Sequence, residues 1–355
     1  MIISRTPFRI SFFGGGTDYP RWFRENGGSV LVTTIDKYCY LTCRILPPFF
    51  AHKTRIAYSH VELVQSHDEI KHPAVWAVLK HLQVQEGLEI HHDGDLPART
   101  GLGSSSAFTV GLLHALRGLR RTMPSKRELA AEAIYIERDL LKETGGLQDQ
   151  VATAFGGFNR IDFFSENDFS VRPVILDRER LLHLQDHLML YFTGFSRNSY
   201  EVAQEQFENI PRKKIELVRM GEMVDEAITL LSGEGDLVEF GTLLHESWKI
   251  KRSLSSQIST SEVEEIYEAA REAGAEGGKL LGAGGGGFLL LFARPEDQPR
   301  IRERLRKLLW VPFRFENNGS QIIFYEANTQ NRDGDFVRAP RPDDPKAVIL
   351  DPAQP

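Results

Sequence analysis

The first part of this chain alternates apolar and polar positions, and its second half follows a helical period. Residues 2–11 alternate with β character, and residues 29–35 and 37–45 are rich in Val, Thr, Ile and Tyr. These patterns predict three strands near the N-terminus. A short helix over 73–83 and a strand over 88–92 are expected next.

Helices dominate the pattern after residue 107. Ser125 and Glu128 have the spacing of a capping box and predict a helix start. Further helices are expected over 108–119, 148–154, 199–254 (with a break at 233–235), 261–273 and 301–309, and strands over 158–164, 187–193, 279–292 (a hairpin) and 321–325. No internal repeat is visible. This order predicts an α+β protein of two lobes with a cleft between them.

The expected division is a first lobe over 1–185, a second over 186–328 and a loose tail over 329–355. The tail is rich in Pro, Asp and Arg and has little apolar periodicity. Apolar residues at 41% and charged residues at 26% of 355 are ordinary for a globular protein.

With a net charge of −6, the chain lacks the excess of basic residues that is typical of nucleic-acid-binding proteins. No apolar run is long enough for a signal peptide or a membrane span, so a cytoplasmic protein is expected. Cys39 and Cys43 are the two cysteines, and reduced core thiols are the expectation for both.

A glycine-rich turn, P-A-R-T-G-L-G at residues 97–103, leads into three serines and a predicted helix. We call this turn the phosphate loop. Glycines let successive backbone N–H groups converge, and the helix N-terminus adds positive potential. The residues expected to hold phosphate are Pro97, Thr100, Gly101, Leu102, Gly103, Ser104, Ser105 and Ser106.

Two other glycine segments do not predict nucleotide loops. Residues 282–287 satisfy G-x-G-x-x-G, but an apolar strand follows them where a dinucleotide site needs a helix. Gly278-Lys279 is followed by Leu280 and lacks the hydroxyl of a Walker A motif. The eleven histidines form no H-x-x-H or H-E-x-x-H pair that would predict zinc.

Four segments that are far apart in the sequence would form one site if all of them bound the same nucleotide: 5–19, 97–107, 137–150 and 282–287. In these motifs and their order the chain resembles the GHMP kinases, over roughly residues 1–327. The resemblance implies a ribosomal-protein-S5-like first lobe and a ferredoxin-like second lobe. It also implies that ATP, Mg²⁺ and a small-molecule substrate are held between them.

The resemblance assigns Asp149 as the general base that faces the acceptor hydroxyl; the alternative is an N-cap of the following helix. It assigns Glu137 to Mg²⁺, against the alternative of a solvated helix-face carboxylate. Ser105 matches the hydroxyl that completes the metal shell. Ser104 or Ser106 could take that place instead, or act as caps.

Arg9 resembles the basic residue near the base and the γ-phosphate, where a fixed cation would stabilise a developing alkoxide. The alternative is a surface cation on an edge strand. Asp18 resembles a galactokinase-branch residue that binds sugar hydroxyls, but glycines replace that enzyme's acid and histidine, so galactose is not expected. The substrate-lining residues expected in the first and last segments are Gly16, Thr17, Asp18, Gly284 and Gly285. The hairpin glycines could instead form only a tight turn.

Residues 3–20, 193–197 and 245–254 resemble bacterial heptose kinases, which phosphorylate D-glycero-D-manno-heptose 7-phosphate at the anomeric oxygen. A substrate that already carries a phosphate needs a second cationic pocket. The candidates for it are Arg197, Lys249, Lys251 and Arg252; a solvated basic helix face is the alternative for the last three.

Two other functions stay open. An L-fucose-type kinase also acts on an anomeric hydroxyl but needs no second phosphate pocket. A sugar sensor of the same fold would bind without turnover, yet Asp149 and Glu137 are both present, which favours an enzyme. The expected partner is a sugar, with no nucleic acid and no membrane, and a homodimer is allowed.

Overall fold

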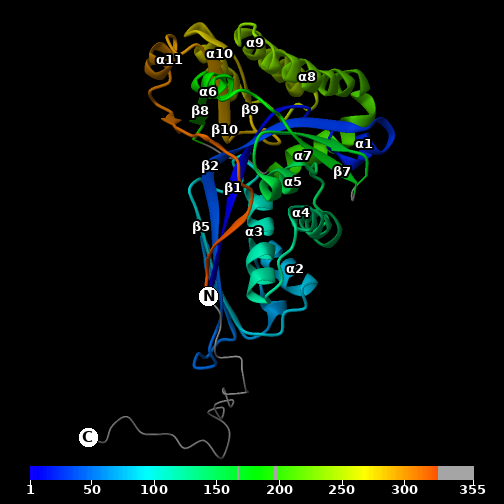
Figure 1. Ribbon diagram of the computed structural model, residues 1–355, viewed down its shortest axis with the longest axis vertical. Helices are drawn as coiled ribbons and strands as arrows, with labels where there is room; N and C mark the ends of the chain where they lie inside the picture. Colours follow the sequence, from blue (N-terminus) through cyan, green and yellow to red (C-terminus); the bar gives the residue numbers. More distant parts are fainter. Residues whose placement is uncertain (166–167, 195–198, 327–355) are drawn as a thin grey trace, which may run out of the picture.

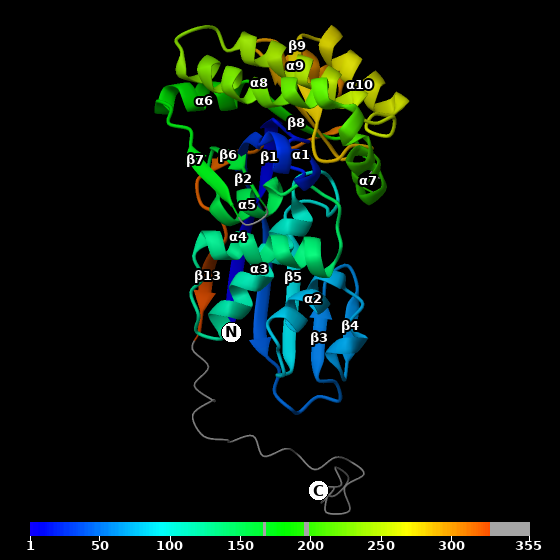
Figure 2. The same ribbon diagram turned by 90° about the vertical axis from the view of Figure 1, so that its right-hand side faces the viewer.

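The computed structural model describes residues 1–165, 168–194 and 199–326, and their strands form two sheets (Figures 1 and 2). Within these residues the first sheet has nine strands: β1 (Ile2–Phe13), β2 (Gly28–Ile45), β3 (Thr54–Ala57), β4 (Val61–Val64), β5 (Leu88–Gly94), β6 (Asn159–Phe163), β7 (Phe169–Pro173), β12 (Phe315–Glu316) and β13 (Gln321–Tyr325). The second has four: β8 (Leu188–Phe192), β9 (Ala275–Leu280), β10 (Phe288–Ala293) and β11 (Leu309–Trp310). The predicted α+β class is confirmed.

The first sheet has the strand order β13-β1-β2-β5-β3-β4, and β6 and β12 also pair with β2. Strand β2 is one strand where the sequence predicted two. Its register against β1 shifts between Pro7, opposite Tyr38, and Phe8, opposite Ile35. Asp36 and Lys37, which lie between these two pairs, form a bulge. The strand therefore continues although its alternation of apolar and polar residues is interrupted.

The helices are α1 (Pro20–Asn26), α2 (Pro73–His81), α3 (Ser104–Leu119), α4 (Lys126–Tyr135), α5 (Gln148–Phe155), α6 (Arg178–Asp186), α7 (Ser199–Asn209), α8 (Lys214–Ser232), α9 (Val238–Ser253), α10 (Ser261–Glu272) and α11 (Gln298–Arg304). The capping box is present, because Ser125 Oγ accepts from the Glu128 N–H and the Glu128 carboxylate accepts from the Ser125 N–H. Helix α3 packs on β1 and β2, and α9 and α10 pack on β9. The first sheet therefore carries the phosphate loop and α3, and the second carries α9 (Figure 2).

The chain returns to the first sheet at its C-terminal end. Strand β12 pairs with β2, and β13 pairs with β1, with Ile2 opposite Tyr325. Figure 1 shows this return as the orange segment that runs down beside β1. The predicted boundary at residue 185 assigns these strands to the second lobe, whereas they pair in the first sheet.

Aromatic side chains join the two sheets. The ring centroid of Phe240 on α9 lies 5.6 Å from that of Phe12 and 5.2 Å from that of Phe13, both edge-to-face. All three side chains are fully buried. Such pairs add to the free energy of burial, so β1 and α9 are held in one packed core.

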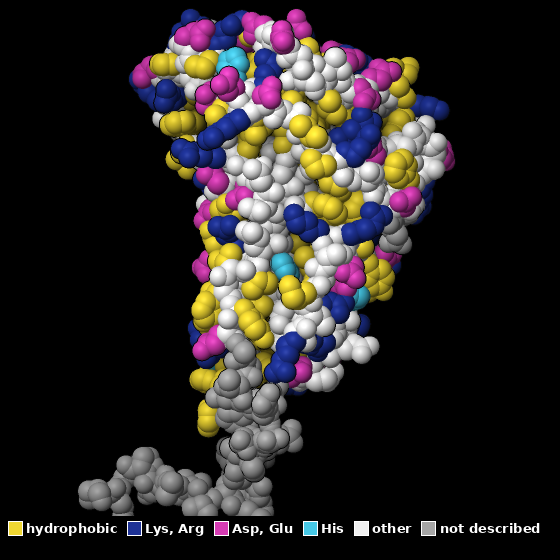
Figure 3. All heavy atoms as spheres, viewed as in Figure 1, with side chains coloured by type: hydrophobic (Ala, Val, Ile, Leu, Met, Phe, Trp, Pro, Cys, Tyr) yellow, Lys and Arg dark blue, Asp and Glu magenta, His cyan; other side chains and the backbone are white. Residues whose placement is uncertain are grey.

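Cys39 and Cys43 are both buried and free, as expected for core thiols. None of the helices in the described residues is both long and apolar enough to cross a membrane. On the face shown in Figure 3, acidic and basic side chains are interspersed over the described part of the surface.

Candidate active site

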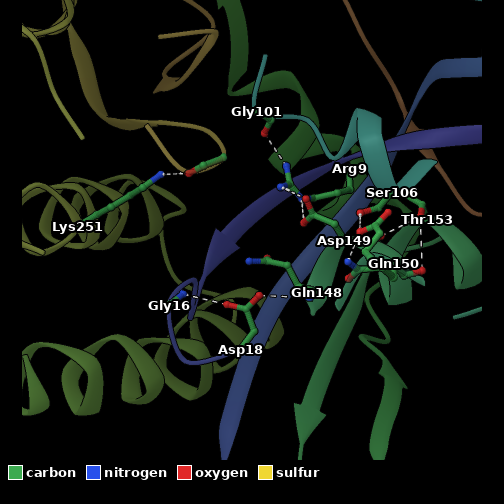
Figure 4. A network of polar contacts seen from close by, with 12 residues as sticks. Arg9, Gly16, Asp18, Gly101, Ser106, Gln148, Asp149, Gln150, Thr153 and Lys251 are labelled. Carbon is green, nitrogen blue, oxygen red and sulfur yellow. Dashed lines mark hydrogen bonds and ion pairs between the residues drawn. The ribbon is translucent and has the colours of Figure 1, made fainter. Parts of the chain in front are cut away.

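The centre of the site is an ion pair between Arg9 on β1 and Asp149 on α5 (Figure 4). Arg9 Nε donates to Asp149 Oδ1, and Nη2 donates to Oδ2, each across 2.7 Å. The Arg9 side chain is 4% exposed and that of Asp149 is 24% exposed, so the carboxylate keeps an accessible edge. A bidentate pair fixes the position and the plane of the carboxylate.

The phosphate loop lies against both members of this pair. Arg9 Nη1 donates to Gly101 O across 2.6 Å, and the Arg9 backbone N–H donates to Leu102 O across 3.0 Å. Gly103 has φ +72°, and a Cβ there would lie 3.4 Å from Asp149 Oδ2. The loop, the cation and the carboxylate therefore form one group.

Helix α3 begins at Ser104, directly after the loop. Its N-cap is Gly103, and no side chain caps its first N–H groups. Thr100 Oγ1 donates to Pro97 O across 2.7 Å, and Ser104 Oγ accepts from the Arg99 N–H across 3.0 Å. These bonds close the loop, and the uncapped helix end offers donors and positive potential to an anion.

Glu137 lies on η2 (Ile136–Leu140), a π-helical turn that continues α4. Glu137 Oε2 accepts from Ser106 Oγ across 2.9 Å and from Gln150 Nε2. The hydroxyl on Glu137 is thus that of Ser106, whereas the sequence favoured Ser105, which is exposed on the first turn of α3. Successive helix residues point about 100° apart, so three adjacent serines cannot share one direction.

Burial, and after it the nearby charge of Glu143, raise the pKa of the Glu137 carboxyl to about 8. Glu137 Oε1 is buried and has no hydrogen-bond partner. A buried oxygen of this kind is costly unless a proton or a cation accompanies it.

Asp18 is fully buried, and its carboxylate is occupied by backbone donors. Oδ1 accepts from the Gly16 N–H across 2.9 Å, and Oδ2 accepts from the Gln148 N–H across 3.2 Å. The Leu147 N–H donates to Asp18 O across 3.1 Å. A Cβ on Gly146 would lie 2.0 Å from Asp18 Oδ2, so only glycine fits there. Asp18 thus holds the N-terminus of α5, the helix that carries the base candidate.

Gly16 and Thr17 lie in the turn that leads to Asp18. Thr17 Oγ1 donates to Gly14 O across 2.8 Å, and the side chain is buried. A Cβ on Gly16 would lie 3.0 Å from Leu217 Cδ2 on α8. The Thr17 hydroxyl therefore stabilises the turn, and Gly16, which has no side chain, lies close to α8.

The glycine hairpin between β9 and β10 lies directly on the phosphate loop. A Cβ on Gly282 would be 2.4 Å from Gly101 Cα, and one on Gly287 would be 2.3 Å from Thr100 O. The Phe288 N–H donates to Thr100 O across 3.1 Å. Both glycines have positive φ, +70° and +105°. These glycines permit contact between two backbones as well as a tight turn.

Gly284 and Gly285 meet another backbone segment. A Cβ on Gly284 would lie 2.7 Å from Ile258 Cα, and the Gly285 N–H donates to Ile258 O across 2.9 Å. Both glycines therefore contact the loop that follows α9.

The structure does not assemble the predicted second phosphate pocket from its helix residues. Lys251 on α9 is buried, and its ammonium donates to Leu280 O and Gly282 O. Lys249 is exposed and points about 200° away around the helix. Arg197 lies outside the described residues.

Comparison with known proteins identifies the family. Residues 69–157 match the family described as GHMP kinases N terminal domain, and residues 226–309 match GHMP kinases C terminal. The chain belongs to the GHMP kinases. This GHMP kinase is therefore an enzyme, and it uses ATP.

Three known proteins are similar along most of this GHMP kinase. A D-glycero-alpha-D-manno-heptose 7-phosphate kinase of Campylobacter jejuni is 29% identical over 320 residues, which cover 86% of this chain and 93% of that protein. An L-fucokinase/L-fucose-1-P guanylyltransferase of Bacteroides fragilis is 27% identical over 87% of this chain, which spans only 36% of that longer protein. The crystal structure of a D-glycero-D-manno-heptose 1-phosphate kinase from Bacteroides thetaiotaomicron superposes with a TM-score of 0.73 at 25% identity, over 92% of this chain and all of that one.

Sequence reasoning missed three residues of this site. Gln150 binds the Glu137 carboxylate, and Gln148 has a buried Oε1 without a hydrogen-bond partner; both residues are labelled in Figure 4. Their positions on either side of Asp149 were the available signal. Lys279 is buried, and its Nζ donates to Phe12 O across 2.7 Å. Burial lowers its pKa to about 7.

The residues present fit a divalent cation at Glu137. Mg²⁺ prefers oxygen ligands, few of them from protein, together with water and phosphate oxygens. Glu137 offers an unpartnered buried oxygen, and Ser106 places a hydroxyl on the same carboxylate at the start of α3. No group of three or more His, Cys, Asp or Glu side chains placed to bind a metal is found among the described residues.

Proposed function

We propose that this protein transfers the γ-phosphoryl group of ATP to the anomeric hydroxyl of a sugar phosphate, D-glycero-D-manno-heptose 7-phosphate, giving the 1,7-bisphosphate. The observation that carries the proposal is the Arg9–Asp149 pair beside the uncapped N-terminus of α3. Phosphoryl transfer needs an oriented nucleophile, a phosphate cradle and neutralised charge, and this group offers all three.

Asp149 is the base in this proposal. Its accessible oxygen edge accepts the proton of the acceptor hydroxyl while the acceptor oxygen bonds to the γ-phosphorus and the bond to the β–γ bridging oxygen breaks. Arg9 keeps the carboxylate oriented and places positive charge beside the developing alkoxide. The proton remains on Asp149 until it passes to solvent after ADP leaves.

The phosphate loop and the first turn of α3 bind the nucleotide phosphates in this proposal. Glu137 with Ser106, or with Ser105 at the exposed position, would hold Mg²⁺. When bound, Mg²⁺ supplies charge neutralisation at the β- and γ-phosphate oxygens. Gly16, Gly284 and Gly285 would line the acceptor side through their backbones.

Heptose 7-phosphate is chosen because a heptose 7-phosphate kinase matches the chain over 86% of its length. A phosphorylated acceptor also gives a role to Lys249, which is exposed on α9, and to Arg197, which lies outside the described residues. The similarity to an L-fucokinase supports a second candidate, transfer to the anomeric hydroxyl of L-fucose.

The test is ADP release with Mg²⁺ and ATP against heptose 7-phosphate, unphosphorylated heptose, L-fucose, galactose and mevalonate. Turnover confined to heptose 7-phosphate is the expected result. Turnover with L-fucose alone would replace the acceptor by a free sugar. Binding of ATP with no turnover of any acceptor would favour a sugar sensor over an enzyme.

A further inference from the structure

Lys251 connects the second sheet to the glycine hairpin. Its side chain is buried on α9, and Nζ donates to Leu280 O across 2.7 Å and to Gly282 O across 2.6 Å. None of the ion pairs in the described residues includes it. A buried amino group that donates to two carbonyls fixes those carbonyls in place, because releasing either one would leave a buried polar group without a partner.

The carbonyls that Lys251 holds lie at the start of the hairpin that rests on the phosphate loop. Gly282 has φ +70° and lies so close to Gly101 that a Cβ would be 2.4 Å from its Cα. A Cβ on Gly101 would in turn be 2.4 Å from Leu281 O. The backbone that Lys251 fixes is thus the surface on which Gly101 rests.

Gly101 in turn orients the ion pair. Its carbonyl accepts from Arg9 Nη1 across 2.6 Å, and the other two guanidinium nitrogens of Arg9 hold Asp149. Contacts therefore run from Lys251 on α9 through Gly282 and Gly101 to the carboxylate, and Figure 4 shows Lys251 at one end and the Arg9–Asp149 pair at the other.

We propose that Lys251 is a positioning residue for the Arg9–Asp149 pair and acts through Gly282 and Gly101. This inference rests on phosphoryl transfer with Asp149 as base, and it does not depend on which sugar is the acceptor. It replaces the interpretation of Lys251 as a clamp for the phosphate of the substrate. Lys251 Nζ already donates two hydrogen bonds to backbone carbonyl oxygens.

The two interpretations differ in the kinetic constant they change. A positioning residue alters how well the acceptor is aligned once bound, so its loss lowers kcat. A clamp for the phosphate of the substrate binds ground state and transition state alike, so its loss raises the KM of a phosphorylated acceptor.

The experiment compares Lys251→Met with Lys214→Met, which removes an exposed charge on the neighbouring helix α8. We expect Lys251→Met to lower kcat by about 10- to 100-fold with little change in either KM, and Lys214→Met to leave kcat unchanged. We also expect faster hydrogen exchange at the backbone amides of residues 99–104 in Lys251→Met. A raised acceptor KM with unchanged kcat would overturn the proposal in favour of the clamp.

Two further controls keep the test decisive. Lys251→Gln retains a donor for one carbonyl and should recover part of kcat; Gly282→Ala leaves Lys251 intact and should lower kcat in the same way. Hydrogen exchange is measured without an acceptor. It therefore tests whether Lys251 holds the phosphate loop in place even if no sugar of the panel is a substrate. Exchange and kcat at the wild-type level in a folded Lys251→Met protein would refute the inference while leaving the proposed function intact.

Discussion

Arg9 and Asp149, 140 positions apart in the sequence, meet through two parallel N–H···O bonds of 2.7 Å each. The third guanidinium nitrogen of Arg9 binds Gly101 O. One side chain therefore sets the distance between the carboxylate and the phosphate loop. This relationship requires the guanidinium geometry as well as its charge, because a single ammonium cannot make three directed contacts in one plane.

Asp149→Asn should abolish most transfer while leaving the fold intact. The amide keeps the size of the side chain but cannot accept the hydroxyl proton, so we expect kcat to fall by about 10²- to 10⁴-fold. Steady-state ADP release, with ATP binding measured separately, checks this. An Asp149→Asn protein that transfers phosphate at the wild-type rate would remove Asp149 from the role of base.

Arg9→Lys keeps the charge and loses the bidentate geometry. We expect kcat to fall by about tenfold or more with the KM for ATP nearly unchanged, because alignment is lost and the phosphate loop is retained. Arg5→Lys on the same strand is the matched control, since Arg5 donates to Gln321 outside the site. Equal effects of the two substitutions would show that strand β1, and not the pair, is being perturbed.

The sequence was sufficient to predict the motifs and the fold class, because both depend on local pattern. The strand of Arg9, the glycine loop before α3 and the Gly-Gly segment before Asp149 each have a recognisable residue spacing. Their order along the chain is what made one shared site a reasonable expectation. The break near residue 233 also followed from local glycines, and the structure places it between α8 and α9.

What the sequence could not provide is the direction in which a side chain points relative to a distant element. Three adjacent serines form the first turn of α3, and only the rotation of that helix against η2 decides that Ser106 meets Glu137. Lys249 and Lys251 form one basic segment by composition, yet the packing of α9 buries one and exposes the other. The return of β13 to β1 depends on pairing across more than 300 residues, for which short apolar strands carry no partner signal.

Glu137→Gln should stabilise the metal-free protein, and increasingly so as pH rises. In the unfolded chain this carboxyl has its ordinary pKa of 4.5, whereas burial, and then Glu143, raises it to about 8 in the fold. Between these values the unfolded state binds fewer protons, so the wild-type free energy of unfolding falls as pH rises. The glutamine is neutral throughout and lacks this loss. Denaturant unfolding from pH 5 to 9 with a chelator measures the difference.

Asp139→Asn is the control for that experiment. Asp139 is exposed two residues from Glu137, so its substitution removes a carboxylate without changing the buried site. The same Glu137→Gln variant should bind Mn²⁺, used as a spectroscopic probe, more weakly than the wild type at pH 8. A pH-independent difference in unfolding free energy between Glu137→Gln and the wild type would contradict a buried titrating carboxyl.

Asp18→Asn distinguishes a positioning role from direct contact with a sugar hydroxyl. Both carboxylate oxygens of Asp18 accept backbone N–H groups, from Gly16 and Gln148, so an amide would place a donor against a donor. An unsatisfied buried group costs about 1–3 kcal/mol. Gln148 directly precedes Asp149, so we expect the base to shift and kcat to fall while the acceptor KM changes little. Gly146→Ala, whose Cβ would lie 2.0 Å from Asp18 Oδ2, should produce the same pattern from the opposite side of the contact. A rise in acceptor KM with kcat preserved in Asp18→Asn would instead place this carboxylate on the sugar.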